Sequence, residues 1–248
     1  MLEESQPAPR PRAGRTMAGR RRLRHALTVA AIDLFLKQGY DATTVDEIAS
    51  AAGVGRRTFF RYFRSKEDAI FPNHEEVLQD IERLFAGADE TRNPVEVACA
   101  GVSLVLDFYL ADPDVSVKRY ALTRTVRSLR DKEVASVDQY QRVLAGYLRG
   151  RFERVGDPLA DLRGSVIAAA VAAAHNHVLR RWLRSGGAGD AHADAEQAFR
   201  LVVEAFPPAG GTARQDAGET VVAVLRSSAA LPDVVNEINA ALRRAEAE

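Results

Sequence analysis

The chain has 248 residues, of which 46% are hydrophobic and 27% are charged, so it is long enough to bury a sizeable core in water. The longest apolar run, residues 166–174, is far shorter than the roughly 18 residues that a membrane span needs. Arg and Pro near the N-terminus stand where a signal peptide requires apolar residues, and the single Cys99 excludes an internal disulfide and a cysteine-cluster metal site. We therefore expect a cytoplasmic protein without membrane contact, with Cys99 as a buried thiol.

The formal net charge of zero conceals an uneven distribution of charge along the chain. Residues 1–66 contain 13 Lys/Arg and 6 Asp/Glu, a net charge of +7, whereas residues 67–248 contain 21 and 28, a net charge of −7. A basic N-terminal part attracts polyanions, and an acidic remainder is repelled by them. Composition alone does not distinguish binding of a polyanion from a chance distribution of charge, so the motifs have to decide between these alternatives.

Residues 1–19 contain Pro, Gly, Ser and Arg but few large apolar side chains, which predicts a mobile arm. From Arg20 to Gly39, apolar residues recur at helical spacing and predict a first helix. The arm and the start of this helix are basic, and two roles remain open for them: contact with a DNA minor groove, or a merely solubilising charge. The arginines concerned are Arg10, Arg12, Arg15, Arg20, Arg21, Arg22 and Arg24.

Residues 44–63 have the pattern of a helix-turn-helix. Thr44 and Glu47 form a capping box at the start of a short helix that runs through Ala52, and Gly53-Val54-Gly55 supplies a turn before a third helix over 56–63. A protein that binds in the DNA major groove requires a helix dense in Arg and aromatic residues, here 56–63, that packs on the helix before it. The residues expected to pack inward are Ile48, Ala49, Ala52, Val54, Phe59 and Phe63.

This pattern resembles the N-terminal signature of the TetR family of transcriptional regulators, over about residues 20–71. The similarity is carried by Phe35, Gly39-Tyr40, Thr43-Thr44-Val45, Ile48-Ala49, Ala52-Gly53-Val54, Thr58, Tyr62-Phe63 and Ser65-Lys66-Glu67-Asp68.

The resemblance implies a role for each matching position. Thr44 and Lys66 are expected to anchor the DNA backbone, Tyr62 is expected to contact a phosphate, and the recognition helix is expected to contact DNA through Arg56, Arg57 and Thr58, with Gly55 beside them. Gly55 stands where the family often has Ser, and Phe60 where it often has a phosphate-binding Tyr, so a hydroxyl contact is missing at each. A helical hairpin that serves only packing is the alternative.

The remainder of the chain predicts further helices and no sheet, so we expect an all-α protein: a helix-turn-helix head over 20–66, a helical regulatory body over 67–206 and an extension over 207–248. Ser65 is expected to cap a helix over 66–86. Asn93-Pro94, Asp112-Pro113 and Asp157-Pro158 pair a capping side chain with a proline at helix starts. The predicted body helices cover 94–111, 114–130, 133–155, 158–185 and 190–206, and the extension is predicted to form helices over 219–226 and 233–245.

The TetR resemblance implies a homodimer formed by the last two body helices, 158–185 and 190–206. Small residues over 166–174 would let helices approach closely, and two heads about one turn of DNA apart would bind a near-palindromic operator. Each candidate could equally belong to the core of a single chain. The candidates are Leu162, Val166, Ala169, Ala170, Ala173, Phe199, Val202 and Phe206.

A small-molecule effector is expected between the body helices, in an apolar cavity, with the 66–86 helix as the lever to the head. Simple core packing is the alternative for its aromatic residues. Lys118, Arg119, Arg124, Arg127 and Arg130 are predicted to lie on one helix, either as a solvated face or as a border of the cavity that would favour an anionic ligand such as an acyl-coenzyme A or a carboxylate. The cavity candidates are Phe108, Tyr109, Tyr120, Arg124, Tyr140, Tyr147 and Trp182.

Nothing in the sequence indicates an enzyme, a metal site or a cofactor. His175 and His177 lie two residues apart on a predicted helix, so their side chains point in different directions and cannot bind one ion together. No GxSxG, P-loop or GxGxxG element occurs. We expect a DNA-binding transcriptional regulator, with repression as the family's usual mode, and a non-specific architectural DNA binder as the alternative.

Overall fold

Capping side chains fix where several helices begin. The side-chain oxygens of Thr16, Asn93, Asp112 and Asp190 each accept a hydrogen bond of 2.9–3.1 Å from a backbone N–H of the first helical turn. These bonds satisfy donors that an isolated helix end leaves unpaired. The predicted caps at Asn93 and Asp112 are therefore confirmed, each followed by a proline in the first turn.

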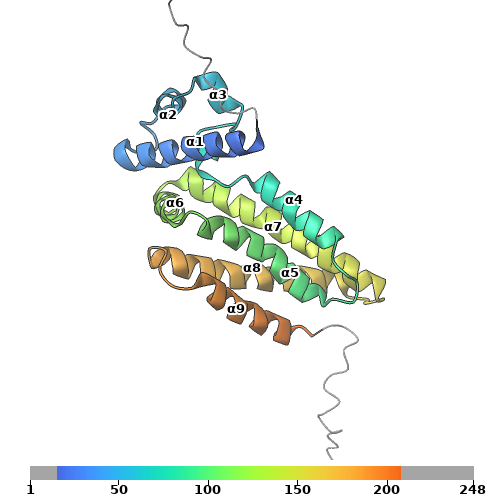
Figure 1. Ribbon diagram of the computed structural model, residues 1–248. Helices are drawn as coiled ribbons and strands as arrows, with labels where there is room; N and C mark the ends of the chain where they lie inside the picture. The colour runs from blue at the N-terminus through green and yellow to red at the C-terminus, as the bar shows by residue number, and fades with distance from the viewer. Residues whose placement is uncertain (1–15, 208–248) are drawn as a thin grey trace, which may run out of the picture. The chain divides into compact units, whose positions relative to one another are not determined.

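The computed structural model describes residues 16–207, which belong to one unit. Helices account for its regular structure and this part of the chain contains no strand, which confirms the all-α prediction (Figure 1). The elements are α1 (Met17–Gln38), α2 (Val45–Ala51), α3 (Arg56–Phe60), the 3-10 helix η1 (Asp68–Ile70), α4 (His74–Ala86), α5 (Pro94–Leu110), α6 (Pro113–Thr125), α7 (Arg127–Arg154), α8 (Ala160–Arg184) and α9 (Ala191–Ala205).

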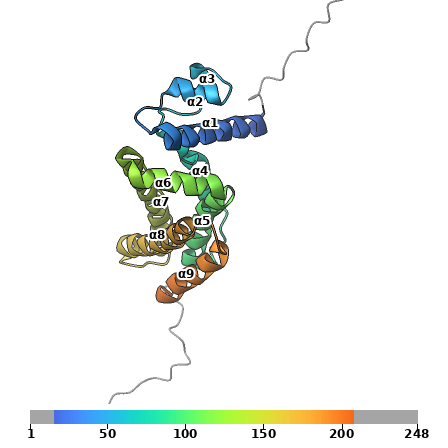
Figure 2. The same cartoon turned by 90° about the vertical axis from the view of Figure 1, so that its left-hand side faces the viewer.

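The first three helices form the head. Figures 1 and 2 both show α1 lying between the short helices α2 and α3 and the body helices. Ile48 and Phe59 are fully buried against α1, Ala49 and Phe63 are buried, and Ala52 and Val54 pack at the edge of the same cluster. The inward face predicted for the helix-turn-helix is confirmed. α1 begins at Met17, three residues earlier than predicted.

The body is built on the packing of α7 against α8, with α4, α5 and α9 around them. Gly164 of α8 marks a close approach of the two long helices: a Cβ there would lie 2.9 Å from the backbone nitrogen of Arg149 and 3.0 Å from the carbonyl oxygen of Ala145. Only glycine fits at this crossing without a shift of backbone. Cys99 is buried as expected, and burial raises the pKa of its thiol to about 12.

The predicted helix over 66–86 is wrong in its first third. Ser65 and Asp68 do exchange the hydrogen bonds of a capping box, but only the short helix η1 follows this box. Phe71 is extended because it precedes Pro72, and α4 begins at His74. The segment that joins head to body is therefore a 3-10 turn and an extended residue, and the expected lever helix starts after it.

The predicted break between two body helices at residues 130–133 is also wrong. Val126 has an extended conformation (ψ 117°) and separates α6 from α7, so the predicted basic run lies on two helices. Arg119 and Arg124 belong to α6, and Arg127 and Arg130 to α7. Arg119 is 4% exposed, so the five residues do not form one solvated face.

The head's apolar core continues into the body through α6. Val115 and Leu122 of α6 and Leu129 of α7 are buried in the same cluster as the head residues Leu27 and Phe59. An ion pair of 3.2 Å between Lys118 of α6 and Asp33 of α1 lies beside them. The head is thus attached by α6 as well as by the segment before α4.

Residues 1–15 of the arm predicted over 1–19, and the helices predicted over 219–226 and 233–245, lie outside the described residues. Within residues 16–207 no single helix has both the length and the apolar character of a membrane span. α5 and α6 pass that test only when they are taken together, and they are bent by 97° at the break between them.

Candidate functional site

The first helix of the helix-turn-helix starts at the predicted capping box. Glu47 accepts hydrogen bonds of 2.8 Å from both the backbone nitrogen and the hydroxyl of Thr44, and the Thr44 hydroxyl accepts one of 3.3 Å from the Glu47 nitrogen. The bonds from Thr44 lower the pKa of the Glu47 carboxyl. The box fixes the start of α2 and thereby the angle at which the next helix leaves.

Two glycines make the turn. Gly53 has φ +70°, a left-handed conformation that side chains rarely adopt, and the following Val54 returns a hydrogen bond of 2.9 Å to the carbonyl of Ala49. Gly55 occupies the N-cap of α3, where no side chain caps the helix and open space surrounds its Cα. A serine would fit at Gly55 without a clash.

Two neighbouring arginines on α3 are exposed but differ in their contacts. The guanidinium of Arg56 donates to the Asp46 carboxylate at 2.6 Å and lies 5.4 Å from the centre of the Phe60 ring. The side chain of Arg57 makes no hydrogen bond or ion pair with any residue in 16–207. Arg57 can therefore reach a DNA base without breaking a contact, whereas Arg56 must first leave Asp46.

The end of α3 is held from α1. Arg24 donates a hydrogen bond of 3.0 Å to the carbonyl of Tyr62, and its guanidinium lies 4.4 Å from the centre of the Phe63 ring. Thr58 and Tyr62 remain half-exposed beside it. Arg24, considered above as part of the basic arm, thus positions the recognition helix, while Arg21 pairs with Glu76 of α4 at 2.5 Å.

Lys66 is bound to the loop that precedes α2. Its ammonium donates to the carbonyls of Tyr40 at 2.8 Å and Thr43 at 3.1 Å and lies 4.1 Å from the centre of the Tyr40 ring. The Tyr40 hydroxyl in turn donates to Glu67, and burial together with this bond raises its pKa to about 12. An ammonium has three donors, so a phosphate contact by Lys66 would use the third.

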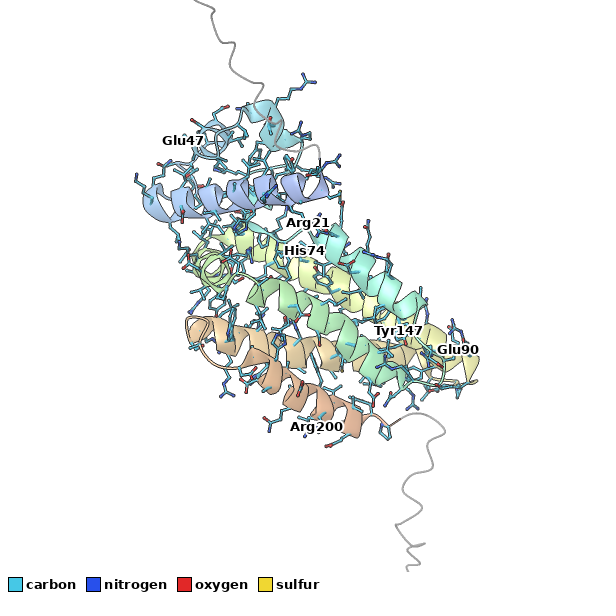
Figure 3. The ribbon with its side chains drawn as sticks, in the orientation of Figure 1. Arg21, Glu47, His74, Glu90, Tyr147 and Arg200 are labelled. Atoms are coloured by element: carbon cyan, nitrogen blue, oxygen red, sulfur yellow. The ribbon has the colours of Figure 1, made fainter. Side chains whose placement is uncertain are left out.

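A small internal cavity of about 50 Å³ lies between α4, α5, α7 and α8. Its walls combine apolar side chains with an unusual number of polar ones. His74 lies at the end of α4 that faces the head, as Figure 3 shows, and the other polar residues come from three helices. The polar lining residues are His74, Tyr109, Glu133, Ser136, Tyr140, His175 and Asn176.

Both histidines of the cavity are neutral and incompletely bonded. The Nδ1 atom of His74 lies 2.7 Å from the Tyr140 hydroxyl, but its Nε2 has no partner in the described chain, nor does Nδ1 of His175. Burial lowers the pKa of each imidazole to about 4, and the nearby charges of Arg119, Arg24 and Lys132 act in the same direction at His74. Unpaired buried nitrogens are costly, which makes them candidates for bonds to a bound molecule.

A larger groove of about 700 Å³ lies between α1 and the body helices α4, α5 and α6. Its lining includes Arg119, whose Nε donates to the carbonyl of Ile70, and Phe108. The Arg119 guanidinium lies 5.9 Å from the centre of the Phe108 ring and 5.4 Å from that of Tyr109. Tyr109 also lines the internal cavity, so Arg119 stands between the two spaces.

The structure separates the predicted cavity residues. Tyr109 and Tyr140 line the internal cavity, and Phe108 lines the groove. The other four line neither space: Trp182 is buried in the body core, Arg124 lies 5.7 Å from the centre of the Tyr120 ring, and Tyr147 stacks on Phe85 at 4.1 Å. Figure 3 shows Tyr147 near Glu90, far along the body from His74.

Family models match most of the described chain. A model for bacterial regulatory proteins of the tetR family matches residues 27–70, and a model for the MftR C-terminal domain matches residues 93–207. The HTH-type transcriptional regulator TcmR of Streptomyces glaucescens is 32% identical over 173 residues, which cover 65% of this chain and 74% of the relative. This chain belongs to the TetR family of transcriptional regulators.

Other TetR-type proteins are similar over shorter or more divergent stretches. The HTH-type transcriptional regulator HbdR of an Aromatoleum species is 30% identical over 140 residues, covering 53% of this chain and 60% of the relative. The crystal structure of FadR from Bacillus subtilis, solved with stearoyl-CoA, has a TM-score of 0.54 at 22% identity and covers 74% of this chain and 99% of that one. The similarity to FadR shows the fold alone.

The helices that the TetR resemblance assigns to dimerisation carry an exposed apolar face. Leu162 and Val166 of α8 are 59% and 46% exposed, Leu201 of α9 is 68% exposed, and Ala169 and Ala173 continue the α8 face at helical spacing. Ala170 and Phe206 are half-buried. Phe199 and Val202 are buried within the chain itself, so they belong to its core.

Sequence reasoning named Arg119 in the basic run and His175 in the histidine pair, but it did not predict that either side chain is buried in this TetR-family chain. Arg119 recurs with Val115 and Leu122 at helical spacing, which could have indicated a buried position. His175 interrupts a run of small apolar residues in the same way. His175 is buried and His177 is exposed, so the two side chains point in different directions, as predicted from their spacing.

Proposed function

We propose that this TetR-family regulator is a ligand-responsive repressor that binds a near-palindromic operator as a dimer. The observation that carries the proposal is the surface of α3, where Arg57 is exposed without a partner in the described chain while Phe59 behind it is fully buried. Such a helix is fixed on one face and available on the other. An arginine in the major groove can donate two hydrogen bonds to guanine, which distinguishes base pairs.

The neighbouring groups support phosphate contacts around that base contact. Thr44 is exposed at the start of α2, Tyr62 is half-exposed after α3, and Lys66 has a donor to spare. Hydroxyl and ammonium groups bind phosphates and fix the register of the protein on DNA. The Asp46 carboxylate, which holds Arg56, would be repelled by the same phosphates, so approach to DNA favours release of Arg56.

The exposed face of α8 and α9 supports dimerisation. A second copy packed on Leu162, Val166 and Leu201 would remove three large apolar side chains from water. A dimer places two recognition helices in successive major grooves of a near-palindrome. Val166→Glu should therefore convert the dimer to a monomer in analytical ultracentrifugation, with exposed Val155→Glu, on the α7–α8 turn, as the control.

The polar cavity and the groove beside Arg119 support a small-molecule effector. FadR of Bacillus subtilis was solved with stearoyl-CoA, so a solved protein with this fold holds a small molecule. A ligand that binds one body shape better than another shifts the population toward that shape. Since α6 shares its buried cluster with the head, a shift of α6 would move the recognition helices.

The test is to incubate the full-length protein with fragmented genomic DNA at about 0.15 M salt, because weaker screening at low salt promotes non-specific binding. Bound fragments are recovered and sequenced, with Arg57→Ala as the matched variant. We expect enrichment of one near-palindrome by the wild-type protein and its loss with Arg57→Ala.

Recovery of fragments without a common sequence would overturn the proposal. That outcome, with strong salt dependence, is what a non-specific architectural DNA binder predicts.

A further inference from the structure

Arg119 is a buried cation without a counterion. Its side chain is 4% exposed, and no carboxylate within residues 16–207 forms an ion pair with it. Nε donates to the Ile70 carbonyl, whereas Nη1 is buried and has no hydrogen-bond partner in the described chain. Burying a charged group is costly unless the group is paired, so the environment of Arg119 is incomplete.

The surroundings of Arg119 only partly offset this cost. Burial lowers the pKa of the guanidinium, and the electrostatic effects of Tyr109, Asp112 and Glu133 act against that shift. The centres of the Phe108 and Tyr109 rings lie within 6 Å of the guanidinium, a distance at which a ring attracts a cation, and the bond from Nε to the Ile70 carbonyl orients it. An oriented guanidinium with a free donor is suited to a planar carboxylate.

The groove beside Arg119 determines which size and polarity the remainder of the ligand can have. Its volume of about 700 Å³ lies within the range of small-molecule sites. Apolar side chains such as Val77, Leu104 and Phe108 line its middle. Arg21, Arg24 and His25 of α1 also line the groove, with Arg21 paired to Glu76 and His25 3.5 Å from Asp112, so the lining has mixed charge. The lining carboxylates come from α4, α5 and the residue before α6. These are Glu76, Asp80, Asp107 and Asp112.

We propose that the effector of this regulator is a monocarboxylate with an apolar body, whose carboxylate binds the guanidinium of Arg119 at the floor of the groove between α1 and the body. This rests on the proposed function for its regulatory meaning, but the binding site itself does not. A free carboxylate carries one charge to the buried cation. A coenzyme A ester has no free carboxylate to pair with that cation.

The same guanidinium connects the site to the head. Ile70 is the last residue of η1, in the segment that joins the helix-turn-helix to α4, and it is fully buried in the head's cluster. A carboxylate bound to Nη1 of Arg119 shares the guanidinium with the Ile70 carbonyl, to which Nε donates. Ligand binding therefore loosens or shifts the contact that positions the head, which would lower the affinity for the operator.

Isothermal titration calorimetry on the full-length protein without DNA tests the site. The probes are decanoate and 2-naphthoate, each compared with its neutral amide, decanamide or 2-naphthamide, and decanoyl-coenzyme A. We expect at least one carboxylate to bind at least about tenfold more tightly than its amide, because the amide cannot pair with the cation. Three outcomes would each overturn the proposal. They are no binding of either carboxylate, equal binding of acid and amide, and tighter binding of decanoyl-coenzyme A than of decanoate.

Variants assign the preference to Arg119. Arg119→Met keeps an unbranched side chain without the charge and should abolish the preference for the acid, whereas the same change at Arg124, an exposed arginine on the same helix, should leave it unchanged. Arg119→Lys keeps the charge and should retain part of the preference. If Arg119→Met does not fold, the Lys variant decides: acid affinity unchanged from wild type would contradict a role for the guanidinium.

Operator binding is measured separately on the fragment recovered by selection. The winning carboxylate should weaken wild-type binding to that fragment, and Arg119→Lys should respond less. Carboxylate binding without a selected fragment would overturn the proposed function and leave the site standing. A selected fragment without carboxylate binding would overturn only the site.

Discussion

The DNA-facing surface of the head and the interior of the body treat their polar groups in opposite ways. On the head, Asp46 and Arg56 pair with each other while both remain about 60% exposed. In the body, nitrogen atoms of Arg119, His74 and His175 are buried without partners in the described chain. Exposed ion pairs are worth little and are readily exchanged for phosphates, whereas buried unpaired atoms bind strongly to whatever supplies a partner. The first arrangement suits reversible DNA binding and the second suits recognition of a small molecule.

The largest effect is expected where the body is most tightly packed. Gly164→Ala places a Cβ 2.9 Å from a backbone atom of α7, so α7 and α8 must move apart. We expect a loss of about 3 kcal/mol in the free energy of unfolding, measured by urea denaturation. Gly146→Ala on α7, where nothing lies within 4 Å, is the control and should stabilise the protein by about 0.5 kcal/mol. Equal effects would refute close packing at this crossing.

The next effect concerns pH. His175 has a pKa of about 4 in the folded protein, below its ordinary 6.5, because burial disfavours its charge. Between these two pKa values the unfolded chain therefore binds more protons than the folded one. The contribution of neutral His175 to the free energy of unfolding is complete above the unfolded pKa and is lost as the pH falls toward 4. Between about pH 7.5 and pH 5 the loss is about 2 kcal/mol.

His175→Gln should remove that part of the pH dependence from thermal unfolding. The exposed His177→Gln, two residues away, should keep the wild-type dependence. His74 has the same low pKa and contributes in the same direction in all three proteins. Parallel curves for the two variants would show that His175 is not held neutral by burial.

On the head, Arg57→Ala should weaken binding to the selected operator roughly tenfold or more, since a good arginine–guanine contact contributes about 1–3 kcal/mol. Fluorescence anisotropy with a labelled duplex measures it. Lys37→Ala, an exposed cation at the end of α1, should change the affinity little. A similar loss for both would mean that charge alone, not the position of Arg57, determines binding.

The smallest effect is expected at the exposed pair. Asp46→Asn removes the carboxylate that holds Arg56 and repels phosphates, so it should strengthen DNA binding by about two- to fivefold, with a change in stability below about 1 kcal/mol. The same anisotropy assay at two salt concentrations checks it. Weaker binding by Asp46→Asn would indicate that the carboxylate itself contributes to recognition.

The sequence predicted the head better than the interior of the body. The capping box at Thr44, the glycine turn and the buried face around Phe59 are local patterns, and the structure contains all three. The start of α4 was misplaced because the box at Ser65 looks like a helix start, while Pro72 stops the helix from continuing.

The cavity depends on packing between helices that are distant in the chain. Tyr109 and Tyr140 could be chosen as aromatic candidates, but nothing local indicates that four helices leave a space between them. Arg119 belonged to a basic run for which a solvated face and a border of the cavity both stayed open, and its burial involves Ile70, Phe108 and Tyr109, which lie on other elements. A charged residue buried without a counterion contradicts ordinary expectation, which is why such positions point to function.

The most direct test of regulated, sequence-specific binding compares two duplexes at about 0.15 M salt, the selected near-palindrome and a scrambled duplex of equal composition. Specific regulators prefer their site by a factor of about a thousand or more, and we predict a preference of that order, with two chains bound per site. Equal affinity for the two duplexes would contradict the account, since it would leave the head a non-specific DNA binder.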